Sequence, residues 1–358
     1  MRRVSNHAPP PVRPSRRPLT RAPQDDEEAR LPGNLDEFDF IARVLRPLTQ
    51  SAPEALGLSD DAAVIPSRPG HELVVTTDAI VEGVHFLPGD PPDLVARKLL
   101  RVNLSDLAAK AAEPYGYFLS ISWPGTWDVQ VRERFAEGLA RDQAEFGLKL
   151  FGGDTTSTPG PFTASVAALG WAPEGRTVKR SGARPGDLLL VSGTIGDGWL
   201  GLLAARGELD DLPDAERDRL AGRYRLPRPR LNLREALRRH AGAATDVSDG
   251  LLADAGHIAD ASGVALWLDL EMLPLSSAAA GWLQRQPDRS TALSALAAGG
   301  DDYEVVCTAS AGDAHVMIGA APADAPLTVI GRVEAGQGLE VFRGDAPQSI
   351  VRLGWRHS

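Results

Sequence analysis

Cysteine is almost absent from this chain, since Cys307 is the only one among 358 residues. A single cysteine excludes a disulfide within the chain and favours a reducing compartment. The sequence also lacks an apolar run long enough to cross a bilayer, and its first residues lack the apolar core of a signal peptide. We therefore expect a cytoplasmic protein with no membrane partner.

Lysine is scarce as well, and it occurs only as Lys98, Lys110, Lys149 and Lys179. None of these lysines follows a glycine, which excludes a phosphate-binding loop of the GxxxxGK[ST] type. The HRD signature of protein kinases is also missing. If this protein handles nucleotide phosphates, it must hold them by another route.

The net charge is distributed unevenly along the chain. The net charge is −10, but residues 1–24 carry six arginines and no acid, which leaves −16 for the rest of the chain. An acidic body disfavours general binding to nucleic acid, so we expect no nucleic-acid partner. The same charge would suit divalent cations.

The distribution of proline, glycine and apolar residues indicates the organisation of the chain. Residues 1–32 are rich in Arg and Pro and are expected to be a disordered tail, because repeated prolines would break the amphipathic helix of a transit peptide. Beyond the tail, apolar periodicity predicts alternating strands and helices, which is typical of an α+β (mixed α/β) fold. We expect an N-terminal domain at 33–171 and a C-terminal domain at 172–358. The expected helices include 91–112 and 131–146, and the expected strands are 73–76, 118–122, 148–151, 164–169, 187–192, 264–268, 302–308 and 327–330.

Five short motifs join acids to glycine or hydroxyl residues. Each motif alone is typical of a helix cap or a turn. Together they match the needs of Mg²⁺, which takes oxygen ligands and is usually held by one or two carboxylates plus substrate phosphates. Several ions on the phosphates of ATP would need acids from several chain segments. The motifs are SDDAA at 59–63, TTD at 76–78, NLSD at 103–106, GGDTT at 152–156 and DVSDG at 246–250.

Asp106 fits the role of a cap least well. It falls inside a predicted helix, between Leu104 and Leu107, where no cap is needed. Asn103 lies three residues earlier and therefore on the same helical face. A carboxylate beside an apolar face is costly unless something positive meets it, so we expect Asp106 to face a cation.

Taken in order, these motifs resemble the thiamine-monophosphate kinase family, within the superfamily of aminoimidazole ribonucleotide synthetase-like enzymes. The resemblance spans about residues 36–355, and its most specific part is TTDAIVEGVHF at 76–86, which is similar to the family's TTDxLVEGVHF. The other matching stretches are NLSDLAA at 103–109, GGDTT at 152–156, RSGA and PGD between 180 and 187, SDGL at 248–251, DYE at 302–304 and GW at 354–355.

The resemblance implies a two-domain fold, a homodimer joined through its N-terminal sheets, and a reaction. In that reaction ATP phosphorylates thiamine monophosphate to thiamine diphosphate. A phosphate ester has a second pKa of about 6, so the acceptor is already largely ionised and needs no strong base. The obstacle is repulsion between two anions, which Mg²⁺ and an arginine can offset, so we expect direct in-line transfer without a phosphoenzyme.

The resemblance also implies roles for individual residues. The predicted contacts to thiamine monophosphate are His85, Asp301 and Trp355. The predicted contacts to ATP are Gly153, Asp154, Arg180 and Ser248, and the predicted catalytic set is Asp106, Asp154, Arg180 and Asp249. The predicted Mg²⁺ ligands are Asp61, Thr76, Thr77, Asp78, Asp106, Asp154, Asp246 and Asp249.

Three positions depart from the family pattern. Ser59 replaces a usual glycine, Asp301 replaces a usual glutamate, and Lys110 stands where methionine is common. If that glycine has an unusual backbone angle, Ser59 would be strained, and Asp301 has a shorter reach towards the substrate. None of the departures removes a predicted metal ligand.

Two alternatives remain at this point. One is another ATP-using synthetase of the superfamily, although a selenide enzyme would need a reactive N-terminal cysteine and Cys307 falls in a predicted strand. The other is a nucleotide-binding scaffold without turnover, which predicts the loss of several acids. Turnover of ATP with thiamine monophosphate distinguishes the three possibilities.

Overall fold

A computed structural model describes residues 37–49, 52–349 and 353–355. The predicted tail at 1–32 lies outside the described residues. The described residues belong to one compact unit that contains two separate sheets. Across these ranges, no helix combines the length and apolar character needed to cross a membrane.

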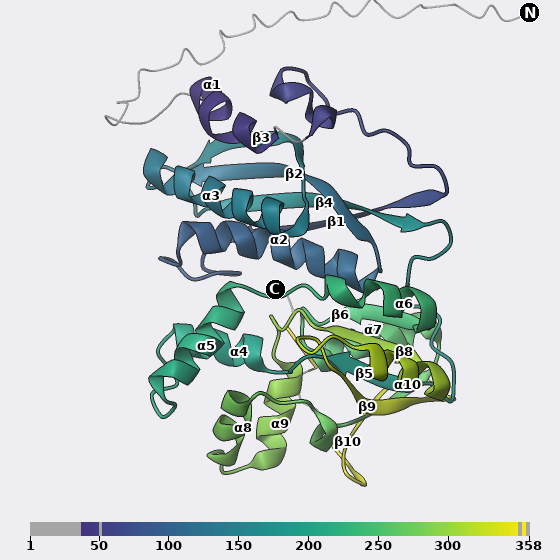
Figure 1. Ribbon diagram of the computed structural model, residues 1–358. Helices are drawn as coiled ribbons and strands as arrows, with labels where there is room; N and C mark the ends of the chain where they lie inside the picture. The colour runs from purple at the N-terminus through teal and green to yellow at the C-terminus, as the bar shows by residue number, and fades with distance from the viewer. Residues whose placement is uncertain (1–36, 50–51, 350–352, 356–358) are drawn as a thin grey trace, which may run out of the picture. The chain divides into compact units, whose positions relative to one another are not determined.

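The first sheet has four strands in the order β1-β4-β2-β3. They are β1 (His71–Val81), β4 (Thr163–Pro173), β2 (Glu113–Pro124) and β3 (Leu150–Thr158), and only the β2–β3 pair is parallel. Helices α2 (Pro92–Ala109) and α3 (Val129–Phe146) pack on one face of this sheet (Figure 1). Alternation along the strands turns apolar side chains such as Ile80, Leu119 and Val166 into the core beneath the helices.

Short helical pieces precede this sheet. Four residues of α1 (Glu37–Phe40) continue into a π-helical turn, η1 (Ile41–Leu45), and then into two 3₁₀ segments, η2 (Arg46–Thr49) and η3 (Pro53–Leu58). The chain is therefore helical from 37 to 49, with one π-helical turn in the middle. Ser59 closes η3 with a φ of −112°, so no backbone strain falls on it, whereas Leu56 and Leu58 have φ values of 50° and 54°.

The second sheet has seven strands in the order β11-β10-β7-β9-β5-β8-β6, and only β10 and β7 pair in parallel. Helices from the same half of the chain pack against it (Figure 1). The strands are β5 (Leu188–Ser192), β6 (Ala243–Asp246), β7 (Ala265–Asp269), β8 (Val305–Ala309), β9 (Leu327–Glu334), β10 (Gly338–Arg343) and β11 (Ala346–Pro347). The helical segments are α4 (Asp197–Ala205), α5 (Asp214–Arg225), η4 (Leu231–Leu233), α6 (Arg234–His240), α7 (Leu251–Ser262), η5 (Leu270–Met272), α8 (Ser277–Gln284), α9 (Arg289–Ala298) and α10 (Ala311–Ala320).

Helix α2 lies between the two sheets and contacts both (Figure 1). Leu99, Leu104 and Leu107 belong to the core of the first sheet. From the C-terminal end of the helix, the Lys110 ammonium donates to the carbonyl oxygen of Ala244 at 2.8 Å. Arg101 donates to the carbonyl oxygen of Pro227 at 3.1 Å. One helix thus fixes elements that are more than a hundred residues apart in sequence.

The mixed α/β class is confirmed, and most predicted elements appear with longer bounds. Two local predictions are wrong. The GGDTT motif is not a turn but part of β3, where a Cβ on Gly153 would lie 1.8 Å from the carbonyl oxygen of Leu119. Glycine is needed there for close strand contact rather than for a turn. The strand predicted from 302 begins only at Val305, so Asp302 and Tyr303 lie in a loop. The division at 171/172 stays a prediction.

Candidate active site

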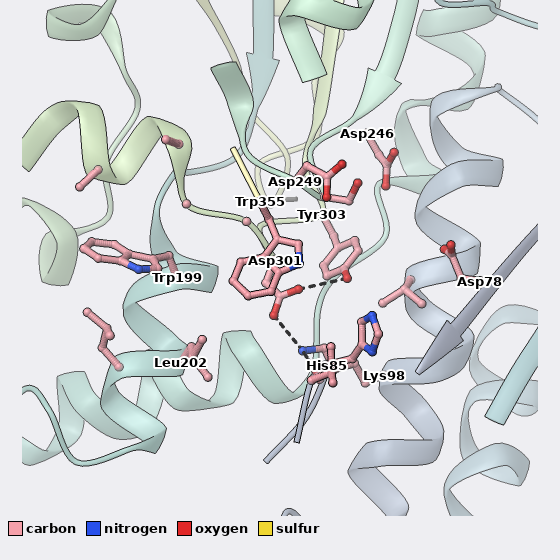
Figure 2. Close-up of a pocket in the computed structure, with 18 of the residues that line it drawn as sticks. Asp78, His85, Lys98, Trp199, Leu202, Asp246, Asp249, Asp301, Tyr303 and Trp355 are labelled. Atoms are coloured by element: carbon pink, nitrogen blue, oxygen red, sulfur yellow. Dashed lines mark hydrogen bonds and ion pairs between the residues drawn. The ribbon is translucent and has the colours of Figure 1, made fainter. Parts of the chain in front are cut away.

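A cavity of about 1370 Å³ lies where α2 and β1 face the loops of the second sheet (Figure 2). Pockets for single small ligands usually enclose about 300–1000 Å³, so this one is large enough for two substrates. In Figure 2, Asp78 lies at one end of the view and Trp199 and Leu202 of α4 lie at the other. The predicted residues that line the cavity are Thr77, Asp78, His85, Asp106, Arg180, Asp246, Ser248, Asp249, Asp301 and Trp355.

Four of these residues form an acidic cluster, which we define as Asp78, Asp106, Asp246 and Asp249. They come from four different places, namely β1, α2, the end of β6 and the loop before α7. All four were predicted as metal ligands, from three separate motifs, and Asp246 and Asp249 share the third. The structure brings all four to one cavity.

Contacts between α2 and β1 hold the first two members of the acidic cluster. The side-chain oxygen of Asn103 accepts the backbone N–H of Asp78 at 3.0 Å, and Asn103 is fully buried. Asp106 accepts the hydroxyl of Thr76 at 2.5 Å. The i, i+3 spacing that placed Asn103 and Asp106 on one helical face therefore places both against the same strand.

The loop 248–250 holds Asp249 in place. Asp254, in the first turn of α7, accepts the backbone N–H groups of Ser248, Asp249 and Gly250 at 3.0, 3.1 and 3.2 Å. Gly250 has a φ of 123°, and a Cβ there would lie 2.6 Å from the carbonyl oxygen of Ala298. Only glycine fits this close approach, which explains the SDG sequence physically.

The acidic cluster forms no ion pair with a basic side chain among the residues that the structure describes. Within the described ranges, no lysine, arginine or histidine nitrogen lies within 4.0 Å of a carboxylate of the cluster. Burial, with the nearby charges of Asp106 and Asp249, raises the pKa of Asp78 to about 6. Burial and Asp106 raise the pKa of Asp246 well above its usual range. Oxygen ligands that repel one another in a cavity suit Mg²⁺, so these residues fit a divalent cation.

This repulsion leads to a prediction about pH. The pKa of Asp78 is above its unfolded value, so its contribution to folding is present below pH 3.8 and is lost as the pH rises through about 6. We expect this residue to lower the free energy of unfolding of the metal-free protein by about 3 kcal/mol between roughly pH 4 and pH 7. Mg²⁺ must displace the retained protons, so its binding should release protons near pH 6 and fewer near pH 8.

Urea unfolding across this pH range measures the first effect. Calorimetric titration of Mg²⁺ in two buffers of different ionisation heat measures the second. Asp78→Asn, which cannot ionise, should show a flatter pH dependence of stability and a smaller proton release. The prediction would be contradicted if the wild type bound Mg²⁺ equally tightly at pH 6 and pH 8 and released no protons near pH 6.

A second group of side chains lines the cavity next to the acidic cluster (Figure 2). Asp301 forms an ion pair with Lys98 at 3.0 Å and accepts the hydroxyl of Tyr303 at 3.1 Å. The ring Nδ1 of His85 accepts the backbone N–H of Val81 at 3.0 Å. Trp355 is half exposed, and its backbone N–H donates to the carbonyl oxygen of Asp249 at 2.8 Å. An aromatic plane and hydrogen-bonding groups at this end suit a flat, polar ring system.

Alternate residues of the loop 301–304 face opposite ways. Asp301 and Tyr303 line the cavity and have left-handed φ values of 68° and 50°. Asp302 and Glu304 are fully buried, and Asp302 accepts the backbone N–H groups of Gly196 and Gly198 at 2.7 and 2.8 Å. The buried pair therefore holds the two cavity-lining residues in a backbone conformation that non-glycine residues rarely adopt.

Four predicted residues do not line the cavity. Thr76 lies directly behind Asp106 as its hydrogen-bond donor. Asp61 is exposed in the loop before β1. Asp154 and Gly153 are also exposed, on β3, and β1 and β3 form opposite edges of the sheet. The register Asp78–Val166–Leu119–Gly153 puts Gly153 three strand spacings from Asp78, roughly 14 Å. Roles for Asp61, Gly153 and Asp154 stay predictions.

Several residues that no motif predicted line the cavity or lie behind it. Lys98, Val102 and Asp106 all line the cavity because they follow one another at intervals of four along α2. This spacing was a usable signal for Lys98. Tyr303, Trp199 and Asp254 gave no comparable signal, because their positions depend on loops that fold against distant parts of the chain.

Comparisons with known proteins agree with these features. The chain matches the family models for AIR synthase related protein, with the N-terminal domain at residues 59–172 and the C-terminal domain at 184–344. The thiamine-monophosphate kinase of Caulobacter vibrioides is 55% identical over 335 residues, which cover 93% of this chain and 94% of that protein. The crystal structure of the thiamine-monophosphate kinase of Stenotrophomonas maltophilia K279a has a TM-score of 0.74 at 40% identity, covering 86% of this chain and 96% of that one. AaThiL complexed with AMPPCP and TMP has a TM-score of 0.72 at 31% identity, covering 84% and 91%.

Proposed function

Because this chain belongs to the thiamine-monophosphate kinase family, among the AIR synthase related proteins, we infer that it transfers a phosphoryl group from ATP to thiamine monophosphate. The products are ADP and thiamine diphosphate. The family and activity predicted from the motifs are thereby confirmed. AaThiL is complexed with AMPPCP, an analogue of ATP, and with TMP, which supports the same pair of substrates here.

The observation that carries the assignment is the pairing of two different regions in one cavity. The acidic cluster, which has no basic nitrogen within 4.0 Å in the described part of the chain, suits Mg²⁺ and the phosphates of ATP. The region around His85, Asp301 and Trp355 suits the rings of the acceptor. The two substrates would thus meet with their phosphates at the acidic end.

The residues of the chain have distinct roles in the proposed transfer. Bound Mg²⁺ would neutralise charge on the phosphates, and Asp78, Asp106, Asp246 and Asp249 would hold it. Arg180 lines the cavity with its Nε anchored on the hydroxyl of Thr245 at 3.1 Å, which leaves the rest of its planar guanidinium for phosphate oxygens. Because the acceptor oxygen is already ionised, we propose in-line transfer without a phosphoenzyme and without a general base.

Turnover with matched acceptors tests this assignment. We expect ADP and thiamine diphosphate to appear with ATP, Mg²⁺ and thiamine monophosphate. No product should appear with unphosphorylated thiamine, since it lacks the acceptor oxygen, or after chelation of Mg²⁺. Equal ATP consumption with and without thiamine monophosphate would contradict the assignment and favour another reaction of the superfamily. The absence of any ATP consumption would favour a scaffold.

We also propose that the protein is a cytoplasmic homodimer joined through its four-stranded sheets. On the sheet face opposite α2 and α3, Val75 is 58% exposed and Leu73 is 40% exposed, which is unusual for neighbouring apolar side chains of one strand. Asp154 is exposed on the opposite edge strand, so contact between two such sheets would bring it towards an interface. Sedimentation equilibrium measures the mass, and a monomer at micromolar concentration would contradict the proposal.

A further inference from the structure

Lys98 is a buried cation in the wall of the cavity. It lies on α2, and its side chain is only 3% exposed. The other two cationic residues that line the cavity, Arg180 and Arg206, are exposed. A buried ammonium is costly unless its N–H groups find partners, so its contacts indicate what it is there to hold.

The Lys98 ammonium has three partners from three separate segments. It donates to Asp301 Oδ2 at 3.0 Å and to the carbonyl oxygen of His85 at 3.0 Å. It also lies 3.8 Å from the ring centroid of Tyr224, on α5, as a cation–π contact. Asp301 and His85 both line the cavity, although they are more than 200 residues apart in sequence. Lys98 is the atomic link between the backbone carbonyl of His85 and the carboxylate of Asp301.

Both linked residues are also fixed on their other sides. The second carboxylate oxygen of Asp301 accepts the Tyr303 hydroxyl at 3.1 Å, so neither oxygen is left to rotate towards solvent. The Nδ1 atom of His85 accepts the N–H of Val81, which places the proton of the neutral ring on Nε2. Aspartate is one methylene shorter than the glutamate common in the family, yet it still reaches Lys98.

We propose that Lys98 is a positioning residue for thiamine monophosphate. It holds His85 and Asp301 at a fixed separation across the acceptor region and neutralises the charge of Asp301. This inference rests on the proposed function. It assigns Lys98 no contact with ATP, because its partners belong to the acceptor region rather than to the acidic cluster. Loss of Lys98 should therefore weaken the acceptor selectively.

Lys98→Met tests the proposal, with Lys149→Met as a matched control. Lys149 pairs with Glu54 at 3.2 Å and lies 4.9 Å from the ring centroid of Tyr115, so it has the same kinds of partner, but it does not line the cavity. We expect Lys98→Met to raise the KM for thiamine monophosphate by on the order of 10- to 100-fold, with the KM for ATP changed less than about threefold. Lys149→Met should leave both KM values within about twofold of the wild type, even if it lowers the melting temperature as much as Lys98→Met does.

Asp301→Asn and the double variant Lys98→Met/Asp301→Asn complete the test. If Lys98 acts through Asp301, the effects of the two changes on the KM for thiamine monophosphate should not multiply. If the Lys98→Met enzyme fails to fold, Asp301→Asn alone tests the proposal, because it should show the same selective rise in the KM for thiamine monophosphate. Fully multiplicative effects, or equal rises in both KM values, would overturn the proposal. Failure of the wild type to phosphorylate thiamine monophosphate would instead overturn the proposed function.

Discussion

Asp106→Asn should lower kcat by roughly 100- to 1000-fold while leaving the protein at least as stable as the wild type. The Asp106 carboxylate lies in the acidic cluster, where its charge raises the pKa values of Asp78 and Asp246. Asparagine keeps the shape and an oxygen for the Thr76 hydroxyl but removes the charge. The substitution therefore relieves repulsion in the metal-free protein and weakens the hold on Mg²⁺ during transfer.

Steady-state kinetics and urea unfolding in the absence of metal measure these two effects. Asp93→Asn is a matched control on the same helix, because Asp93 pairs with the surface residues Arg134 and Arg141 at 3.1 Å and does not line the cavity. That variant should keep its kcat and lose less than about 1 kcal/mol of stability. Unchanged kcat in Asp106→Asn would remove Asp106 from the metal site.

Glu304→Gln should lower the free energy of unfolding by about 3–5 kcal/mol, a large part of a typical total of about 5–15 kcal/mol. Glu304 is fully buried and accepts hydrogen bonds from Arg230, Arg223 and the Ser192 hydroxyl. A Cβ on Gly193 would lie 2.3 Å from its Oε1, so the chain is packed tightly around the carboxylate. Glutamine cannot neutralise the buried Arg230 or the partly buried Arg223, and its amide N–H groups would face N–H groups that already point at this position.

The change in urea midpoint measures this loss. Glu334→Gln provides the control, since Glu334 pairs with Arg332 at 2.6 Å but both side chains are about half exposed. Its loss should stay below about 1 kcal/mol, because solvent screens exposed pairs. If the two substitutions cost the same, Glu304 would contribute no more than a surface pair, and the account of the loop 301–304 would be wrong.

The sequence predicted which residue types form the site better than it predicted which of those residues share the cavity. Asp78, Asp106, Asp246 and Asp249 were expected from local motifs, and they share one cavity. Asp61 and Asp154 were predicted as metal ligands from motifs of the same kind, but neither residue lines the cavity of this chain. A motif records side-chain type and spacing, which are local. Whether two motifs meet depends on strand order, and the order β1-β4-β2-β3 puts Asp154 on the edge opposite Asp78.

The two wrong secondary-structure predictions, one of a turn and one of a strand, have the same physical origin. In GGDTT, glycines and an acid predicted a turn, but pairing with β2 keeps the segment extended. At 302–304, alternation predicted a strand, but buried hydrogen bonds to Asp302 hold the segment as a loop that presents Asp301 and Tyr303. In both cases long-range contacts overrode local propensity.

The family was indicated by motifs that resemble those of its members, read in order along the chain, and the mixed α/β class was indicated by apolar periodicity. The residue types that handle phosphate were indicated by carboxylates, glycines and hydroxyls at fixed local spacings. No local pattern predicted that Lys98 would meet Asp301, 203 residues away. Nor did one predict that four acids would converge with no basic nitrogen of the described residues within 4.0 Å. Such meetings depend on how helix α2 packs between two sheets. That packing is the sum of many distant contacts, so no short stretch of sequence records it.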